Sequence, residues 1–356
     1  MSMLTAAAPF VVNKVLPRFD QRIEESAKPF DRPGLLRPHA GSRTWAWTHY
    51  GIFVPELPRP HRYLNTMTLI GSTGAVCFDN DYLATSDARR TTTVLSSTAA
   101  PGHHHYQAYD SRTECRFAED GSRLEWDSDL AVEAAHPSYQ VHARYAGFSA
   151  DLAITATPQV SWFVRNPAYD HLSLLASFTG MITDDTGETE IGGLCTVEYA
   201  RSLSPQALRR SPLPQRFKLP IDFFTYQIIN LDERTQLLLT DVRAAGATAC
   251  RLAHLRTLDG AAAVYREVRV EVAHRAKPEV DPRGREMRVP ERFRWTVRDG
   301  AEEVVAVEAV VDSPLRYGHG RGYVGAYTYS GAFRGRPVSG SGYFEWVDCE
   351  ISRAGR

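Results

Sequence analysis

This chain of 356 residues has no long apolar run, no closely spaced cysteines and almost no net charge. No segment approaches the roughly 18 consecutive apolar residues that a membrane-spanning helix needs. The formal net charge is −1, from 41 basic and 42 acidic residues, so the chain carries no broad field for nucleic acid or for an anionic membrane. We therefore expect no membrane span and no nucleic-acid partner.

The five cysteines are an odd number and are scattered, without the close spacing of a structural zinc site or a disulfide framework. We expect reduced thiols at Cys77, Cys115, Cys195, Cys250 and Cys349. Residues 1–20 lack the basic segment followed by a long apolar stretch that is typical of a secretory signal. By elimination, we expect a cytoplasmic protein.

Common catalytic and nucleotide-binding motifs are also missing. The chain has no G-x-S-x-G, H-E-x-x-H, Walker A or C-x-x-C pattern. Residues 320–325 match G-x-G-x-x-G, but a strand-like segment follows them, whereas a dinucleotide site needs a helix there to hold the pyrophosphate. We therefore expect no cofactor.

Three consecutive histidines, His103 to His105, raise the question of a metal site. Neighbouring residues on an extended strand point to opposite faces, so at most His103 and His105 could share one ion. No carboxylate partner is evident from the sequence. The prediction is a surface loop after Pro101 and Gly102, with no metal.

From Thr44 onward the dominant hydrophobic period is two, which is typical of half-buried strands. Residues 292–298 and 264–274 both alternate apolar and polar side chains, and turn sequences containing glycine occur at 119–122, 184–187, 258–260 and 298–300. Helical periodicity is scarce outside the N-terminus, which disfavours a parallel α/β sheet because parallel strands need crossovers. The sequence predicts an all-β protein of sandwich or barrel type.

The length exceeds what one hydrophobic core usually serves, so we expect two domains. Residues 1–40 are predicted to form an arm with one short amphipathic helix around Val12 to Ile23, which could pack on the first domain or stay flexible. The proline- and arginine-rich stretch 202–220 is predicted to link a first domain at 41–201 to a second at 221–352.

The ends of the two predicted domains resemble each other. In each, a glycine is followed five positions later by glutamate and then by an aromatic residue. The first copy is Gly193, Glu198 and Tyr199, and the second is Gly340, Glu345 and Trp346. Because both copies fall at the end of a β-rich half, we interpret them as a duplicated unit.

Residues 329–345, with the run Gly335-Arg-Pro-Val-Ser-Gly-Ser-Gly-Tyr-Phe-Glu345, resemble the closing motif of the AttH and carotenoid 1,2-hydratase (hydroxyneurosporene synthase) group. The resemblance implies two tandem lipocalin-like antiparallel β-barrels. It also implies an apolar and often unsaturated ligand, such as a terpenoid or polyene, held in or between the barrels. Fungal pericyclases share this arrangement. The chain departs from the hydratases at the end of the first domain, where Glu198 can stand for their aspartate but the tryptophan and second acid have no counterpart.

Glu198 and Glu345 are the candidate catalytic acids. A carboxylic acid buried in a barrel has a raised pKa, so it could protonate an alkene while aromatic faces shelter the resulting cation. Otherwise both glutamates cap strand ends or pair with arginines. His171 and His319 are further candidates for acid or base catalysis because imidazole titrates near neutrality, although such residues are also common strand-end hydrogen-bonders.

Three functions agree with these patterns: an enzyme that acts on an apolar small molecule without a cofactor, a carrier that binds such a molecule unchanged, and a protein-interaction module with filled barrels. Ionisable groups facing a cavity would favour the enzyme. The sequence leaves the oligomeric state open. Candidate ligand-binding residues, chosen as aromatic or histidine positions near the predicted site, are Trp47, His49, Tyr50, Tyr169, Tyr199, Tyr329 and Trp346.

Overall fold

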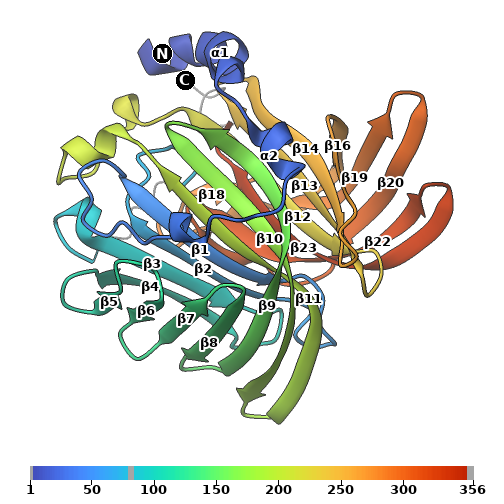
Figure 1. The fold of residues 1–356 in the computed structure, drawn as a ribbon, viewed down its shortest axis with the longest axis horizontal. Coiled ribbons are helices and arrows are strands. Elements are labelled where there is room, and N and C mark those ends of the chain that lie inside the picture. Colours follow the sequence, from blue (N-terminus) through green and yellow to red (C-terminus); the bar gives the residue numbers. More distant parts are fainter. Residues whose placement is uncertain (1–2, 79–83, 351–356) are drawn as a thin grey trace.

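The computed structural model describes residues 3–78 and 84–350, and most of them lie in antiparallel strands (Figure 1). The helices are short and lie mainly before the first strand. They are α1 Met3–Phe10 and α2 Arg22–Ser26, a π turn Val11–Val15, and 3-10 turns Leu16–Arg18, Pro33–Leu35, Ala88–Arg90, Pro205–Leu208 and Gln215–Phe217. Across the described ranges, no helix has both the length and the apolar content to cross a membrane.

The N-terminal segment packs against both halves of the molecule. Its helical part begins at Met3, earlier than the sequence predicts, and α2 lies over strand β9, Ser149–Asn166 (Figure 1). The buried Ser26 hydroxyl accepts a hydrogen bond of 2.8 Å from the Trp162 amide, and Arg22 donates to the Ala249 carbonyl. The segment is therefore a packed element.

The first sheet has eleven antiparallel strands in the order β4-β3-β2-β1-β11-β10-β9-β8-β7-β6-β5. Its strands are β1 Trp47–Val54, β2 Leu64–Gly71, β3 Thr91–Ser97, β4 His104–Asp110, β5 Cys115–Phe117, β6 Arg123–Trp126, β7 Leu130–Ala135, β8 Ser138–Arg144, β9, β10 Tyr169–Asp184 and β11 Gly187–Ser202.

The second sheet has the order β15-β14-β13-β12-β23-β22-β20-β19-β16, with β21 paired to β22, and a separate hairpin joins β17 to β18. Its strands are β12 Ile221–Asn230, β13 Thr235–Ala244, β14 Ala247–Thr257, β15 Ala262–Tyr265, β16 Glu267–Arg275, β17 Glu279–Val280, β18 Glu286–Met287, β19 Pro290–Asp299, β20 Glu302–Val311, β21 Arg316–His319, β22 Gly322–Phe333 and β23 Arg336–Asp348.

Each sheet curls around its own apolar core, one as a barrel and the other as a half-barrel. The first encloses Trp126 and Trp162, and the second encloses Trp295 and Trp346. The alternating segment 292–298 is a strand as predicted, whereas 264–274 is divided between β15 and β16 at Arg266. The all-β, tandem lipocalin-like fold predicted from the sequence is confirmed.

The two sheets pack against each other through strands near the middle of each. Alternation along β1 directs Tyr50 and Ile52 into the first barrel, whereas Phe53 points to the second sheet. There the Phe53 ring stacks on Tyr343 at 5.4 Å and meets Tyr226 edge-on at 6.1 Å. Residues from both sheets thus share one buried layer.

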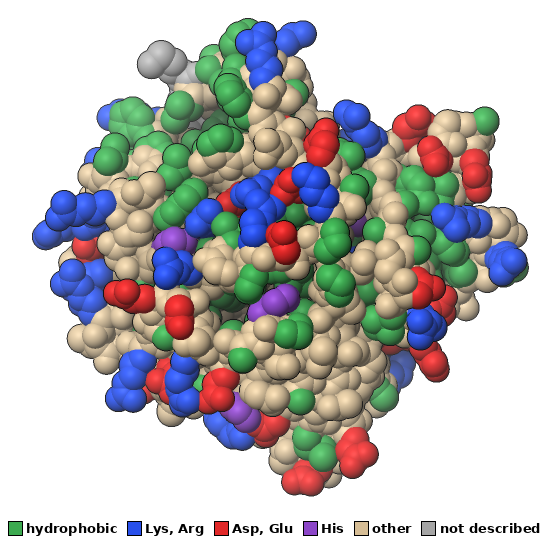
Figure 2. All heavy atoms as spheres, viewed as in Figure 1, with side chains coloured by type: hydrophobic (Ala, Val, Ile, Leu, Met, Phe, Trp, Pro, Cys, Tyr) green, Lys and Arg blue, Asp and Glu red, His purple; other side chains and the backbone are tan. Residues whose placement is uncertain are grey.

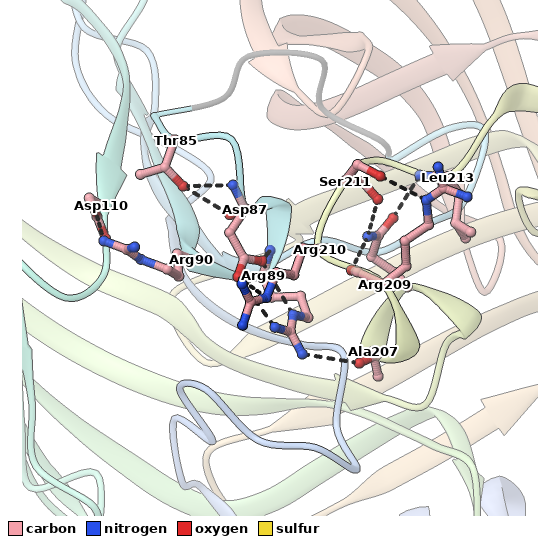
Figure 3. A network of polar contacts seen from close by, with 11 residues as sticks. Thr85, Asp87, Arg89, Arg90, Asp110, Ala207, Arg209, Arg210, Ser211 and Leu213 are labelled. Carbon is pink, nitrogen blue, oxygen red and sulfur yellow. Dashed lines mark hydrogen bonds and ion pairs between the residues drawn. The ribbon is translucent and has the colours of Figure 1, made fainter.

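The segment between β11 and β12 is tied to the loop that follows β2. The Arg89 guanidinium contacts both Asp87 and the Ala207 carbonyl (Figure 3). The Ala88 amide also donates to the Arg210 carbonyl at 2.7 Å. The division into domains at 202–220 remains a prediction. Basic and acidic side chains are interspersed over the face shown in Figure 2.

Candidate active site between the two sheets

The two glutamates predicted as catalytic acids occupy equivalent places in the two sheets. In each sheet the last strand pairs with the first, and the glutamate lies on that last strand. Glu198 of β11 is opposite Gly51 of β1, and Glu345 of β23 is opposite Tyr226 of β12. Their side chains are 3 % exposed each and belong to the layer between the sheets.

Two imidazoles from the strands beside β11 face the Glu198 carboxylate. His49 and His171 both pair with Ala200, two residues further along β11, so all these positions are on one face of the sheet. The Nε2 atoms of His171 and His49 lie 3.6 and 3.9 Å from Glu198 Oε2. These distances are too long for hydrogen bonds but short enough for a strong electrostatic interaction.

The far side of each imidazole is held by another group. His49 Nδ1 donates to the Thr68 carbonyl at 2.8 Å, and His171 Nδ1 lies 3.2 Å from the Tyr169 hydroxyl. Burial acts to raise the pKa of Glu198, but the two imidazoles outweigh it and lower that pKa to about 2. Burial lowers the pKa of His171. Glu198 is thus an ionised carboxylate at neutral pH.

Glu345 has the opposite electrostatic environment. Burial raises the pKa of Glu345 well above its usual range, and the negative charge of Glu198 adds to this. The Tyr343 hydroxyl donates to Glu345 Oε1 at 2.9 Å, and His319 Nε2 lies 3.3 Å from Oε2. Burial lowers the pKa of His319 to about 3, so this imidazole is neutral. Burial thus favours the protonated form of Glu345, whereas the surroundings of Glu198 favour the carboxylate.

Arg256 of β14 connects the second sheet to the first in this layer. Its guanidinium donates to both the carbonyl and the hydroxyl of Ser173 and to Gln236 Oε1, at 2.7 to 3.1 Å. The side chain is 1 % exposed, and burial lowers the pKa of Arg256 to about 10, which leaves it charged at neutral pH.

Several buried polar atoms in this layer lack an aligned hydrogen-bond partner among the described residues. They are His171 Nε2, His319 Nε2, Glu198 Oε1 and the Tyr226 hydroxyl. Each such atom costs roughly 1–3 kcal/mol if nothing else satisfies it. We call the whole group the inter-sheet site; its members are His49, His171, Glu198, Tyr226, Arg256, His319, Tyr343 and Glu345.

An apolar cavity of about 230 Å³ lies inside the first barrel, and Glu198 is among the residues that line it. Tyr50, Tyr139, Trp126 and Tyr199 line it, and the hydroxyls of Tyr50 and Tyr199 donate to the carbonyls of residues 36 and 37 near its mouth. Its volume lies between that of a cavity that holds benzene and the roughly 300 Å³ at the lower end of drug-sized pockets. It suits a compact apolar molecule better than a long polyene.

The aromatic residues predicted to bind ligand do not all lie in one site. Tyr50 and Tyr199 line the barrel cavity, whereas Trp47 and Tyr169 contact each other at 5.6 Å in a small cluster beside the inter-sheet site. Tyr329 belongs to the core of the second sheet, where its hydroxyl donates to the Asn230 carbonyl. Trp346 also faces that core and donates to the Arg288 carbonyl.

Sequence reasoning missed Tyr226, Tyr343 and Arg256. Tyr343 could have been found, because it is two residues before Glu345 and so shares its face of the strand. Tyr226 and Arg256 depend on which strands become neighbours, and the sequence pattern does not encode that directly.

Within residues 3–78 and 84–350, two groups of histidine and carboxylate side chains have the geometry to hold a metal ion. The strand triad is His49, His171 and Glu198, within the inter-sheet site. The hairpin triad is His61, His103 and Asp184. The predicted surface position of His103 is wrong, because this side chain is 2 % exposed and stacks on Phe148 at 4.6 Å.

The fold and the inter-sheet site define a tandem lipocalin-like protein with a buried polar centre between its two sheets. Residues 67–356 match a family of unknown function, DUF6670, and the chain belongs to that family. The chain is similar in structure to an AttH protein from Nitrosomonas europaea, with a TM-score of 0.60 and 14 % identity over 90 % of this chain and 97 % of that one.

A second similar structure is kievitone hydratase from Nectria haematococca, with a TM-score of 0.55 and 9 % identity over 90 % of this chain and 93 % of that one. CghA with Sch210972 aligns at a TM-score of 0.47 and 12 % identity over 86 % of this chain and 89 % of that chain, which is too low to support an argument. No curated protein matches the sequence. The predicted resemblance to the AttH group is confirmed as a likeness of fold.

Proposed function

We propose that this protein converts an apolar, unsaturated small molecule by proton transfer, without a cofactor. The observation that carries the proposal is the opposite ionisation of two buried carboxyl groups in one layer, Glu198 as carboxylate and Glu345 as acid. Pairs of titratable groups whose pKa values are pushed apart are typical of acid and base assignments in enzymes. Kievitone hydratase, a protein of similar fold, is by its name a hydratase.

In this proposal Glu345 donates its proton to a carbon of the substrate double bond. Glu198 then accepts a proton, either from water that adds to the cation or from a neighbouring carbon. The first course gives hydration, and the second gives isomerisation. A ring closes when a second double bond of the substrate attacks the cation, and the new cation then loses a proton to Glu198. The rings of Phe53, Tyr226 and Tyr343 pack together beside both carboxyl groups and offer faces that stabilise a cation.

Deuterium labelling tests the proposal even while the substrate is unidentified. Extracts of the host are incubated with the protein in D₂O and compared by mass spectrometry. The wild type is expected to give a product with deuterium bound to carbon, with added water if the reaction is a hydration. Glu198→Gln and Glu345→Gln are expected to lose at least about 100-fold in rate.

Glu190→Gln is the matched control, because Glu190 is an exposed residue of the same strand as Glu198. It should convert the substrate at the wild-type rate. Normal conversion by both Glu198→Gln and Glu345→Gln would rule the proposal out.

A second candidate function is carriage of an unchanged ligand, which the apolar cavity of the first barrel favours. Ala134 lies at the partly exposed end of that cavity, so Ala134→Trp narrows it. If the protein is a carrier, a co-purifying ligand is lost in Ala134→Trp and is recovered unchanged from Glu198→Gln and the wild type alike. If it is an enzyme, the glutamate variants change what is recovered.

A further inference from the structure

The hairpin triad lies away from the inter-sheet site, where three connections of the first sheet meet. His61 is in the loop between β1 and β2, His103 directly precedes β4, and Asp184 ends β10. One ligand atom from each of the three lies within 4.8 Å of the others. His103 Nε2 is 3.1 Å from Asp184 Oδ2, and their side chains are 3 % and 6 % exposed.

The surrounding contacts orient these side chains as in a metal site. Thr98 Oγ1 lies 3.0 Å from His103 Nδ1, the nitrogen that faces away from Asp184. Asp184 Oδ1 accepts hydrogen bonds from the amide and hydroxyl of Thr186, which leaves Oδ2 for the imidazole side. Outer contacts of this kind fix the orientation of metal-binding imidazoles and carboxylates.

His61 supplies an independent observation. Its side chain is buried, and its Nδ1 has no hydrogen-bond partner among the described residues. An imidazole nitrogen buried in this state is costly unless a ligand occupies it. Burial lowers the pKa of both His61 and His103, so both rings can offer a lone pair at neutral pH.

We propose that His61, His103 and Asp184 bind a divalent transition-metal ion. Two neutral imidazoles and one carboxylate are a ligand set that suits zinc and related ions. The ion joins three hairpin connections at one end of the barrel. Arg316 of the second sheet donates to the Ala100 carbonyl in the turn before His103, so the ion also braces a contact between the sheets.

The strand triad is the competing location. Its distances of 3.6 and 3.9 Å from imidazole to carboxylate are wider than the 3.1 Å of the hairpin triad. The hairpin triad lies next to the surface, because Asp185 and Thr186 beside Asp184 are exposed. A binding site that an ion can enter from the surface is the better candidate.

Metal analysis of the purified full chain tests the proposal, after loading with Zn²⁺ or Co²⁺ and removal of the excess. The wild type is expected to hold one ion per chain and to unfold at a higher temperature when loaded. Asp184→Asn and His103→Gln are expected to lose the ion. Asp185→Asn and His142→Gln are matched controls at exposed positions and should retain it.

A wild type that holds no ion would overturn the proposal. So would an ion that survives Asp184→Asn but is lost in His171→Gln, because that result places the metal in the strand triad. If the hairpin variants fail to fold, the visible spectrum of the Co²⁺-loaded wild type decides. Protein ligands change the spectrum from that of the aqueous ion, and an unchanged spectrum contradicts the proposal.

Discussion

Glu198 and Glu345 occupy matching positions in the two sheets, yet their surroundings shift their pKa values in opposite directions. Both lie on the last strand of a sheet, which pairs with its first strand, and both are buried in the same layer. Glu198 faces two imidazoles, which lower its pKa to about 2 despite burial. Glu345 faces one imidazole, a tyrosine hydroxyl and the charge of Glu198, and its pKa is raised by burial above all.

The difference shows that neighbouring side chains, and not the place in the fold, decide which carboxyl group carries the proton. The partner on the adjacent strand differs as well. Gly51, which pairs with Glu198, leaves room for the rings of His49 and Phe53. The residue that pairs with Glu345 is the bulky Tyr226. The two sheets offer similar positions, and the surrounding residues lower the pKa of one carboxyl group and raise the pKa of the other.

The largest effect on stability is expected from removing the guanidinium that joins the two sheets near Glu198. Arg256→Met leaves Ser173 and Gln236 without their buried donor and should cost about 3 kcal/mol of unfolding free energy. Urea unfolding measures it. Arg294→Met, at an exposed position of β19, serves as control and should change stability by less than about 0.5 kcal/mol. Equal losses in the two variants would contradict the buried role of Arg256.

Opposite dependence on pH is the next expected effect. The pKa of Glu198 is lowered on folding, so its contribution is present above the pKa of the unfolded chain and is lost as pH falls toward 2. Glu198→Gln should therefore be less stable than the wild type by about 2 kcal/mol at pH 7, and the gap should close in acid.

The pKa of Glu345 is raised on folding, so its contribution is complete below the unfolded pKa and is lost as pH rises. The stability of Glu345→Gln should consequently rise relative to that of the wild type as pH increases. Chemical unfolding between about pH 2 and pH 9 measures both variants. If the free energies of unfolding of the two variants change with pH in the same way, the opposite pKa shifts of the two glutamates are contradicted.

A smaller effect is expected from filling the space beside Glu198. A Cβ atom at position 51 would lie 2.4 Å from the Phe53 ring and 2.9 Å from His49 Nε2. Gly51→Ala should cost about 1–2 kcal/mol, because both rings must move. Thermal unfolding tests this against Gly34→Ala, where an added Cβ meets nothing within 4 Å. A neutral Gly51→Ala would show that the rings beside Glu198 are loosely held.

The smallest effect is expected from one hydroxyl on the Glu345 side. Tyr343→Phe removes the hydroxyl that donates to Glu345 Oε1 at 2.9 Å, and should cost about 1 kcal/mol of unfolding free energy. That hydrogen bond lowers the pKa of Glu345, so its loss should raise the pKa further. Tyr169→Phe, which alters a contact of His171, is the control and should leave Glu345 unchanged. Titration of Glu345 by carbon-13 NMR distinguishes the two.

The sequence was sufficient to predict the strands and the two glutamates, because alternation of period two and the repeat of glycine, glutamate and an aromatic residue are local patterns. It also placed His171 and His319 near the site. It could not predict which sheet faces pack together, so Tyr226 and Arg256 were missed. For the same reason Asp184 was not recognised as a partner of His103, since 81 residues separate two groups that only the closed barrel brings to 3.1 Å.

Infrared difference spectroscopy at pH 7 tests the different protonation states of the two glutamates most directly. Spectra of the wild type minus each variant isolate the vibrations of the substituted carboxyl group. We expect Glu345→Gln to remove the C=O stretch of a protonated carboxylic acid, and Glu198→Gln to remove carboxylate bands only. Carboxylate bands lost in both variants, or a protonated acid lost from Glu198→Gln, would contradict the assignment of acid and base.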